Sequence, residues 1–127
     1  MKTFIHPSLE IESNYAPFAY FNGDSGVLSI NGNAISGREE SNLFSLVVLV
    51  DEYFIEQDRL VCDFHFSDFN SRACKLSFNI FRSLKSHHIN GKEIEINWFV
   101  EKDNQEVRDT GYDYAELFDF EINVEAA

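Results

Sequence analysis

The chain has 127 residues, 44% of them hydrophobic, with 22 acidic and 10 basic side chains and a formal net charge of −12. This length suits one domain, residues 1–127, and the negative charge disfavours nucleic acid and membrane surfaces and favours a basic protein partner. The start, MKTFIHPSLE, lacks the apolar run of a signal peptide, and the longest apolar stretch, LVVLV, is too short to span a membrane, so we expect a location in a bacterial cytosol.

Turn residues punctuate the first third of the chain. The run NGDSG at 22–26 separates two apolar segments, 18–21 and 27–30, and a second turn signal, NGN, follows at 31–33. Short apolar segments on either side of such a turn are typical of paired strands. The sequence therefore predicts an N-terminal hairpin.

The next element is a predicted helix from about 38 to 56. Ser36 and Glu39 have the Ser-x-x-Glu spacing of a capping box at its start. Apolar residues spread around much of the helix circumference, so a strand is an alternative for LFSLVVLV at 43–50. Either element would be deeply buried or would contact a partner.

The rest of the chain alternates between strand and helix patterns. Apolar residues recur at every second position in 60–67 and 94–100, and at helical spacing in 72–88. The segment 103–106 provides another helix start, and strand alternation returns at 118–124. The predicted order is ββαβαβαβ.

Every second strand residue in this pattern is polar, so one face of the sheet should be open to solvent. The helices should then pack on the opposite face, and right-handed crossovers should join the parallel strands. We therefore predict an α/β fold with a mixed sheet, an N-terminal hairpin and helices packed mainly on one face.

The sequence lacks the common motifs of catalysis and cofactor binding, with no GxSxG, no GxxxxGK[ST] or GxGxxG loop and no HExxH. We therefore expect a protein without enzymatic activity and without a cofactor. His87 and His88 are adjacent, and on a helix they point about 100° apart, so no metal site is expected there. Cys62 and Cys74 lack metal-ligand spacing and lie on apolar faces, which predicts buried, reduced thiols.

Acidic residues also occur on the predicted strands, namely Asp63, Glu93, Glu95, Asp119 and Glu121. They could converge on the open face as a carboxylate cluster that binds a cation, and a small-ligand binder or hydrolase would depend on such a cluster. A solvated polar face has the same sequence pattern, and the sequence alone leaves both interpretations open.

The segment FSDFNSRACKLSFNIFRSLK at 66–85 carries the most specific candidate site. A strand leads through Asn70 directly into a helix, so the hydroxyl of Ser71 lies at the positive end of a helix dipole. Unpaired N–H groups of a first turn favour an anion, which makes Ser71 a candidate phosphorylation site. Asn and Ser at this position also act as helix caps, and that structural role is the alternative.

The segment DFNSRACK resembles the YxNTSSxK signature of the SiaC family of bacterial regulatory phosphoproteins. Asn70 and Lys75 match this signature, and Ser71 stands where the family has its phosphorylatable Thr. Three further segments, SLEIESNYAPFAYF, GVLSINGNAIS and INWFVEKDNQEVRDTGYDYAELFDFEI, resemble other motifs of the family in the same order. The resemblance covers nearly the whole chain and implies a STAS-like, SpoIIAA-like fold similar to anti-sigma-factor antagonists.

The resemblance implies a signalling adaptor that is switched by reversible phosphorylation at Ser71. A partner kinase would add the phosphate, a PP2C-type phosphatase would remove it, and an effector such as a diguanylate cyclase would bind one of the two forms. Arg72 and Lys75 would then lie beside the phosphate as counter-charges.

Several positions depart from the family pattern. Ser71 replaces Thr, Arg72 and Ala73 replace the serines that follow, and SGR at 36–38 stands where PEN is common. These changes leave the identity of the kinase and of the effector open. The alternative function is a constitutive scaffold or homodimer that uses the apolar helix near 43–55 as its interface, with Ser71 only a helix cap.

Overall fold

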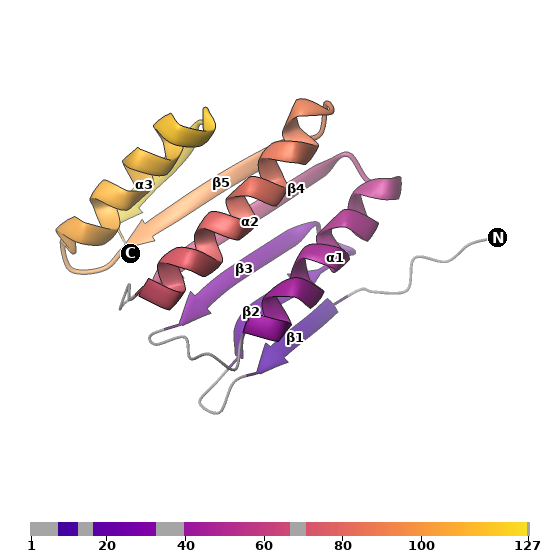
Figure 1. The fold of residues 1–127 in the computed structure, drawn as a ribbon, viewed down its shortest axis with the longest axis horizontal. Helices are drawn as coiled ribbons and strands as arrows, with labels where there is room; N and C mark the ends of the chain where they lie inside the picture. Colours follow the sequence, from indigo (N-terminus) through magenta and orange to yellow (C-terminus); the bar gives the residue numbers. More distant parts are fainter. Residues whose placement is uncertain (1–7, 13–16, 33–39, 67–70, 127) are drawn as a thin grey trace.

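The computed structural model describes residues 8–12, 17–32, 40–66 and 71–126, which form a six-stranded sheet and three helices. In chain order the elements are β1 (Ser8–Glu12), β2 (Pro17–Asn22), β3 (Val27–Gly32), α1 (Glu40–Glu56), β4 (Arg59–Phe66), α2 (Ser71–Ile89), β5 (Glu93–Val100), α3 (Gln105–Phe118) and β6 (Ile122–Ala126) (Figure 1). The predicted mixed α/β fold is confirmed. One strand, β1, was not predicted, although its sequence, SLEIE, alternates polar and apolar residues over five positions.

The strand order in the sheet follows the chain order from β1 at one edge to β6 at the other. The first three strands pair antiparallel, whereas β3 to β6 pair in parallel. The predicted hairpin is confirmed as β2 and β3. Asn22 organises its turn, because the Asn22 side-chain oxygen accepts hydrogen bonds from the N–H groups of Asp24 at 2.9 Å and Ser25 at 3.1 Å.

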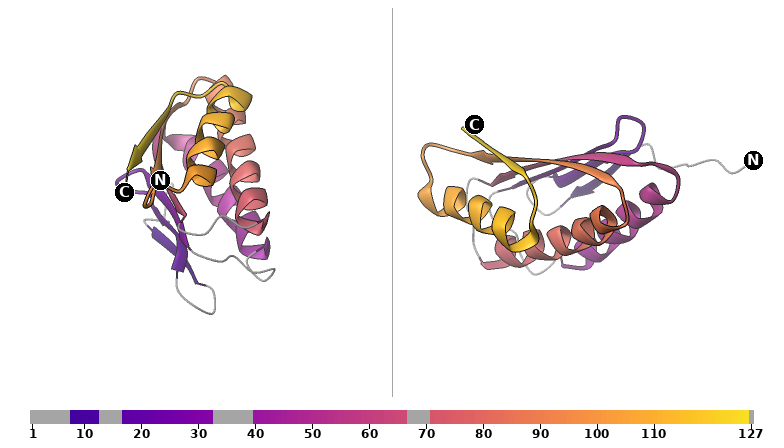
Figure 2. Two further views of the ribbon diagram at one scale, coloured as in Figure 1. Left: turned by 90° about the vertical axis from the view of Figure 1, so that its left-hand side faces the viewer. Right: turned by 90° about the horizontal axis from the view of Figure 1, so that it is seen from above.

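The three helices cover one face of the sheet, and no described helix lies on the other face (Figure 2). Burial along the strands follows this arrangement. In β4, the side chains of Leu60, Cys62, Phe64 and Phe66 are buried beneath the helices, while the residues between them are partly exposed. The open face that the alternation predicts is therefore confirmed.

Aromatic side chains fill the layer between the sheet and the helices. Trp98 of β5 is fully buried, and its ring centroid lies 5.5 Å from Phe64, 5.9 Å from Phe66, 6.1 Å from Phe81 and 5.7 Å from Tyr114. Aromatic pairs at such separations contribute about 0.5–1.5 kcal/mol each beyond the burial of their area. These contacts join β4, β5, α2 and α3 in one core.

Residues 43–50 belong to the helix α1, so the strand alternative for this segment is wrong. Positions at helical spacing are buried in α1, namely Leu46, Leu49, Val50, Tyr53 and Phe54. Val48 and Ile55 remain 37% and 76% exposed on its outer side. The predicted capping box, Ser36 and Glu39, lies outside the described residues. None of the helices that the structure describes has the length and apolar character needed to cross a bilayer.

The predicted strand at 118–124 begins later than the alternation indicates. Helix α3 continues through Phe118 and ends at Asp119, whose φ of 56° is left-handed and whose N–H bonds to the carbonyl of Ala115. Phe118 and Phe120 are both buried, since they pack beneath the helix end rather than along a strand. Two buried residues separated by one exposed residue look like strand alternation in the sequence. The strand β6 itself starts at Ile122.

The two cysteines differ in burial, although the sequence predicts that both are buried. Cys62 is fully buried in β4, and burial raises the pKa of its thiol. Cys74 is exposed, because it lies at the border of the apolar stripe of α2 rather than within it. Both are free thiols, as predicted, and only the prediction of burial for Cys74 is wrong.

Candidate functional site

Helix α2 begins at Ser71, the candidate phosphorylation site, and Ser71 is exposed to solvent. The preceding strand ends at Phe66, and Asn70 lies outside the described residues. The N–H groups of a first helical turn have no partner within the helix, and the dipole of this 19-residue helix adds positive potential. The first turn of α2 contains no acidic residue. The Ser71 hydroxyl is therefore accessible and lies in a positive field.

Lys75 is exposed one turn after Ser71, outside the set of apolar residues at helical spacing that the sequence shows in 72–88. Residues four apart on a helix are neighbours, with about 5–6 Å between their Cβ atoms. The structure therefore brings these two predicted site residues together on one side of the helix. The side chain of Arg72 is outside the described part of the chain, and its role as a counter-charge stays a prediction.

Polar side chains that the sequence analysis missed hold the first two turns of α2 to α3. The Tyr114 hydroxyl lies 3.1 Å from the Ser77 hydroxyl, 3.6 Å from the Cys74 thiol and 3.2 Å from the Cys74 carbonyl oxygen. The Ser77 hydroxyl donates to the same carbonyl at 3.1 Å. Burial raises the pKa of Tyr114, so the phenol stays protonated and available as a donor. This polar group fixes the start of α2 against α3.

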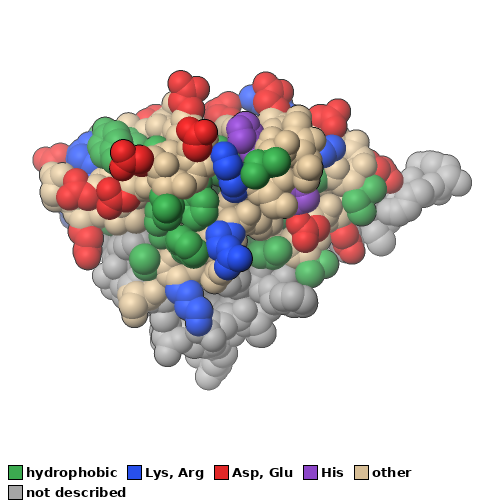
Figure 3. Space-filling view, turned by 45° about the horizontal axis from the view of Figure 1, so that its top comes forward, with side chains coloured by type: hydrophobic (Ala, Val, Ile, Leu, Met, Phe, Trp, Pro, Cys, Tyr) green, Lys and Arg blue, Asp and Glu red, His purple; other side chains and the backbone are tan. Residues whose placement is uncertain are grey.

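Helix α2 differs in charge from the rest of the molecule. Its sequence, SRACKLSFNIFRSLKSHHI, contains two Lys and two Arg but no Asp or Glu, although acidic residues outnumber basic ones 22 to 10 in the chain. In Figure 3, Lys and Arg side chains follow one another down the middle of the helical face, and acidic side chains gather toward its edges. The molecule thus presents a narrow positive surface that starts beside Ser71.

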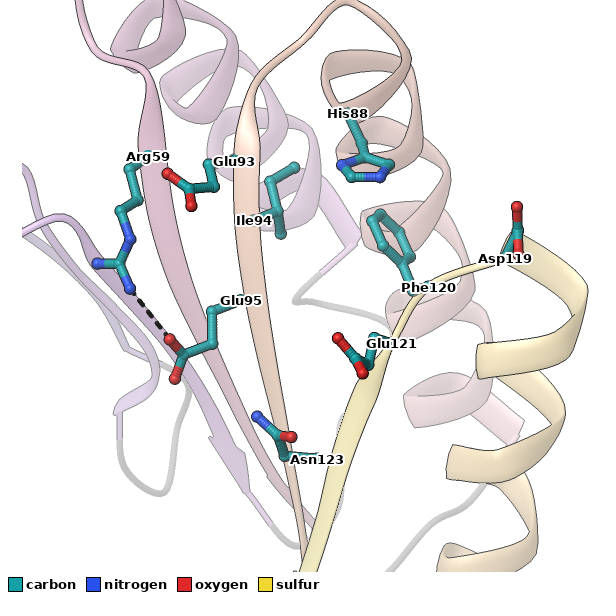
Figure 4. Close-up of a pocket in the computed structure, with 9 residues that line it drawn as sticks. All are labelled: Arg59, His88, Glu93, Ile94, Glu95, Asp119, Phe120, Glu121 and Asn123. Carbon is teal, nitrogen blue, oxygen red and sulfur yellow. Dashed lines mark hydrogen bonds and ion pairs between the residues drawn. The ribbon is translucent and has the colours of Figure 1, made fainter.

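A cavity of about 710 Å³ lies at the other end of α2, where β5 and β6 begin. Its lining includes four carboxylates, Glu93, Glu95, Asp119 and Glu121, together with Arg59, His88, Ile94, Phe120 and Asn123 (Figure 4). Within the lining, a nitrogen of Arg59 lies 3.1 Å from a carboxylate oxygen of Glu95. Ser71 and Lys75 do not line the cavity, so it is separate from the candidate phosphorylation site.

Four of the five carboxylates named from the sequence line this cavity and Asp63 does not, but within the described residues they do not form a metal-binding cluster. Asp63 accepts a hydrogen bond from the Asn97 amide at 2.8 Å, and Glu95 pairs with Arg59. Across residues 8–12, 17–32, 40–66 and 71–126, no three His, Cys, Asp or Glu side chains are placed to hold a metal ion together. The observed arrangement is that of a solvated polar face.

His87 and His88 point toward different partners, as their adjacent positions predict. His87 Nε2 lies 2.6 Å from Asp51 Oδ1, and the His87 ring packs 4.6 Å from the ring of Phe54, so this histidine joins α2 to α1. His88 Nδ1 lies 3.3 Å from the carbonyl oxygen of Lys92. Each histidine thus has a structural contact of its own.

The fold and the site define a class of protein: a small α/β domain that exposes a hydroxyl at the start of a positively charged helix. The sequence matches the profile of the SiaC family regulatory phosphoproteins over residues 11–127. The chain therefore belongs to the SiaC family. No curated protein sequence matches it at a significant level.

Solved structures from Pseudomonas aeruginosa share the fold. SiaC of this organism is 18% identical with a TM-score of 0.78, and the match covers 94% of this chain and 98% of that chain. The crystal structure of apo-SiaC matches with 18% identity, a TM-score of 0.79 and the same coverage. A chain in the crystal structure of the diguanylate cyclase SiaD in complex with its activator SiaC is 19% identical, with a TM-score of 0.78 and coverage of 94% and 99%.

Proposed function

We propose that this protein is a cytoplasmic, non-enzymatic signalling adaptor whose partner binding is switched by reversible phosphorylation of Ser71. The observation that supports it is the exposed Ser71 hydroxyl at the first residue of α2, in a member of a family of regulatory phosphoproteins. A phosphate adds close to two negative charges and three acceptor oxygens. An anion at a helix start is stabilised by about 0.3–2 kcal/mol, so the modified state is compatible with the fold.

The proposed cycle requires three partners. A protein kinase transfers phosphate to Ser71, a PP2C-type phosphatase removes it, and an effector binds one of the two forms. The effector class is suggested by SiaC of Pseudomonas aeruginosa, which is the activator of the diguanylate cyclase SiaD in their complex. A diguanylate cyclase is therefore the effector class that we propose for this chain.

The switch would act through charge at a rigid position. Phosphate on Ser71 changes the local field from positive to negative, one turn from Lys75. An effector that contacts this end of α2 with acidic or apolar groups would be repelled or displaced. The contacts of Tyr114 with Ser77 and Cys74 hold the first two turns of α2, so the new charge would stay at a defined place.

Phosphopeptide mass spectrometry tests the modification directly. Protein purified from its native host with phosphatases inhibited should carry phosphate at Ser71, and Ser71→Ala should remove it. Ser86→Ala is the matched control, because Ser86 is an exposed serine near the other end of the same helix and should not alter the labelling. An unmodified Ser71 under every growth condition would contradict the proposal.

Binding measurements test the consequence of the modification. Calorimetry with a diguanylate cyclase from the native host should show that Ser71→Ala and Ser71→Asp change the affinity for the cyclase in opposite directions relative to the wild type. Ser86→Asp places the same charge near the far end of α2 and controls for a general effect of net charge. Equal affinity of the Ser71→Ala and Ser71→Asp variants would refute a charge-based switch.

A constitutive scaffold or homodimer is the second candidate function, and the exposed apolar residues of α1 favour it. Ile55 is 76% exposed and Val48 is 37% exposed on the same outer side of that helix. Analytical ultracentrifugation separates the two functions. A tight dimer that is insensitive to Ser71 phosphorylation and is broken by Ile55→Glu would support this second function, whereas a monomer would exclude the homodimer.

A further inference from the structure

The outer side of α2 combines positive charge with an exposed aromatic ring. Lys75 and Arg82 are exposed on it, and Lys85 is partly exposed. Lys75 and Arg82 are seven residues apart, which is two helical turns or about 10 Å along the axis. Phe78, between them in the sequence, is 37% exposed. A partner on this side would therefore meet charges about two turns apart and an apolar contact beside them.

Phe78 is an exposed aromatic residue that also packs against α3. Its ring centroid lies 6.4 Å from that of Tyr114 and 5.3 Å from that of Phe118, both on α3. The ring thus packs on the side of α2 that faces α3 and still keeps over a third of its surface open. Because anchored aromatic residues provide much of the energy of many interfaces, Phe78 is suited to seat an apolar side chain.

The neighbouring helices limit the width of the positive surface. Four exposed acidic residues lie on α3, namely Glu106, Asp109, Asp113 and Glu116. Three exposed acidic residues, Asp51, Glu52 and Glu56, lie in the described part of α1. Both helices pack beside α2, and Figure 3 shows the acidic side chains toward the edges of this face. A long phosphate backbone would run over these negative edges and be repelled, whereas one acidic helix would fit between them.

We propose that the outer side of α2 docks an acidic amphipathic helix of the effector protein. Carboxylates two turns apart on that helix face Lys75 and Arg82, and its apolar side packs on Phe78. An amphipathic helix that docks on a protein surface makes its contacts through side chains at positions i, i+3, i+4 and i+7. This inference rests on the proposed adaptor function and specifies the chemistry of the partner.

Phosphate on Ser71 would affect the near end of this surface more than the far end. Lys75 is one turn from Ser71, whereas Arg82 is eleven residues away, about 16 Å along the helix axis. Charges in solution are screened over about 8 Å at physiological ionic strength. Phosphate therefore weakens the contact at Lys75 strongly and the contact at Arg82 little, so the effector is loosened from one end.

A designed peptide tests the surface without the native effector. The probe is a fluorescent, helical 21-residue peptide with Leu on one side and Glu at positions seven apart, and its control replaces Glu with Lys. Fluorescence anisotropy should show binding of the acidic peptide only, and the affinity should fall as salt rises. Equal binding of the acidic and the basic peptide would overturn the inference.

Two charge reversals locate the contact. Arg82→Glu should weaken binding of the acidic peptide by about tenfold, since it replaces an attraction with a repulsion. Lys102→Glu is the matched control, because Lys102 is also exposed but lies in the segment between β5 and α3, and it should leave the affinity unchanged. Equal affinities of the two variants would overturn the inference, while Ser71 phosphorylation in the native host would still support the switch.

Two other occupants have distinct outcomes in the same experiments. Tighter binding of a single-stranded RNA than of the acidic peptide would assign the surface to nucleic acid and overturn the inference. Salt-sensitive self-association that Arg82→Glu abolishes would assign it to the acidic α3 of a second copy, which would also overturn it. Binding of the acidic peptide alone, dependent on Arg82, supports the inference even if Ser71 proves unmodified.

Discussion

Replacement of Gly111 by alanine tests the packing that holds α3 over the core. Gly111 lies inside α3, and glycine in a helix interior is about 1 kcal/mol less favourable than alanine. However, Gly111 is buried against Trp98. A Cβ atom at this position would lie 2.6 Å from Cδ1, 2.8 Å from Nε1 and 3.0 Å from Cγ of the indole ring. Either the ring or the helix must therefore move.

The indole ring cannot move without a large loss of free energy. Trp98 is fully buried, packs against Phe64 and Phe81, and donates a hydrogen bond from Nε1 to the Val107 carbonyl at 2.8 Å. Overpacking costs about 1–3 kcal/mol, and a buried donor that loses its acceptor costs about 1–3 kcal/mol more. After subtraction of the gain in helix propensity of about 1 kcal/mol, we expect Gly111→Ala to lower the free energy of unfolding by about 1–5 kcal/mol.

Urea unfolding followed by fluorescence measures this change, because Trp98 is the single tryptophan of the chain. Thr110→Ala is the matched control. Thr110 is the preceding residue of α3, is only partly buried, and donates its hydroxyl to the Glu106 carbonyl of its own helix at 2.9 Å. That variant should stay within about 0.5 kcal/mol of the wild type. If Gly111→Ala were as stable as the wild type or more stable, the packing argument would be refuted.

Three further outcomes are expected. Burial raises the pKa of Tyr114, so above pH about 10 the folded state keeps a proton that the unfolded state loses, and the free energy of unfolding falls as pH rises. In urea titrations, Tyr114→Phe should make this fall less steep by up to about 1.4 kcal/mol per pH unit. An unchanged slope would contradict the raised pKa of Tyr114. Ellman's reagent should modify Cys74 rapidly and Cys62 only after unfolding, and Cys74→Ser should abolish the rapid phase; a rapid phase that persists would refute the difference in burial. Gly26→Ala should destabilise more than Gly91→Ala, since both glycines have positive φ but a Cβ at Gly26 would also lie 2.6 Å from a tyrosine hydroxyl; equal losses in thermal unfolding would show that this contact relaxes.

Hydrophobic periodicity predicted the elements that bury apolar residues on one side only. In α2, the inward residues Ala73, Leu76, Ile80, Phe81 and Leu84 are all buried, because an amphipathic pattern states locally which side meets the core. Helix α1 gave no such pattern, since apolar residues occur around it and Ile55 is apolar although it is exposed. Only packing against the sheet decides between helix and strand there.

Contacts between distant elements account for most of what the sequence did not reveal. Ser77 is a polar residue within the apolar stripe of α2 and is fully buried, which indicates a buried hydrogen-bond partner. Nothing local identifies that partner as Tyr114, which lies 37 residues further along the chain. The position of Ser71 at a helix start was predictable, because a change from strand to helix periodicity marks it. The positive side of α2 was readable from composition, but its acidic borders depend on which helices flank it.

The order of strands in the sheet has a consequence for synthesis on the ribosome. Every strand pairs with the one that precedes it in the chain, and the parallel pairs Val27 with Val61 and Val61 with Glu95 each close a segment of 34 residues. Translation at about 5–20 residues per second delivers such a segment in about 2–7 s, far longer than loops and helices need to form. Each strand can pair as soon as the next strand in the chain has been synthesised. The nascent chain can therefore extend its sheet one strand at a time from the N-terminus, and its open edge stays exposed only until the next helix and strand emerge.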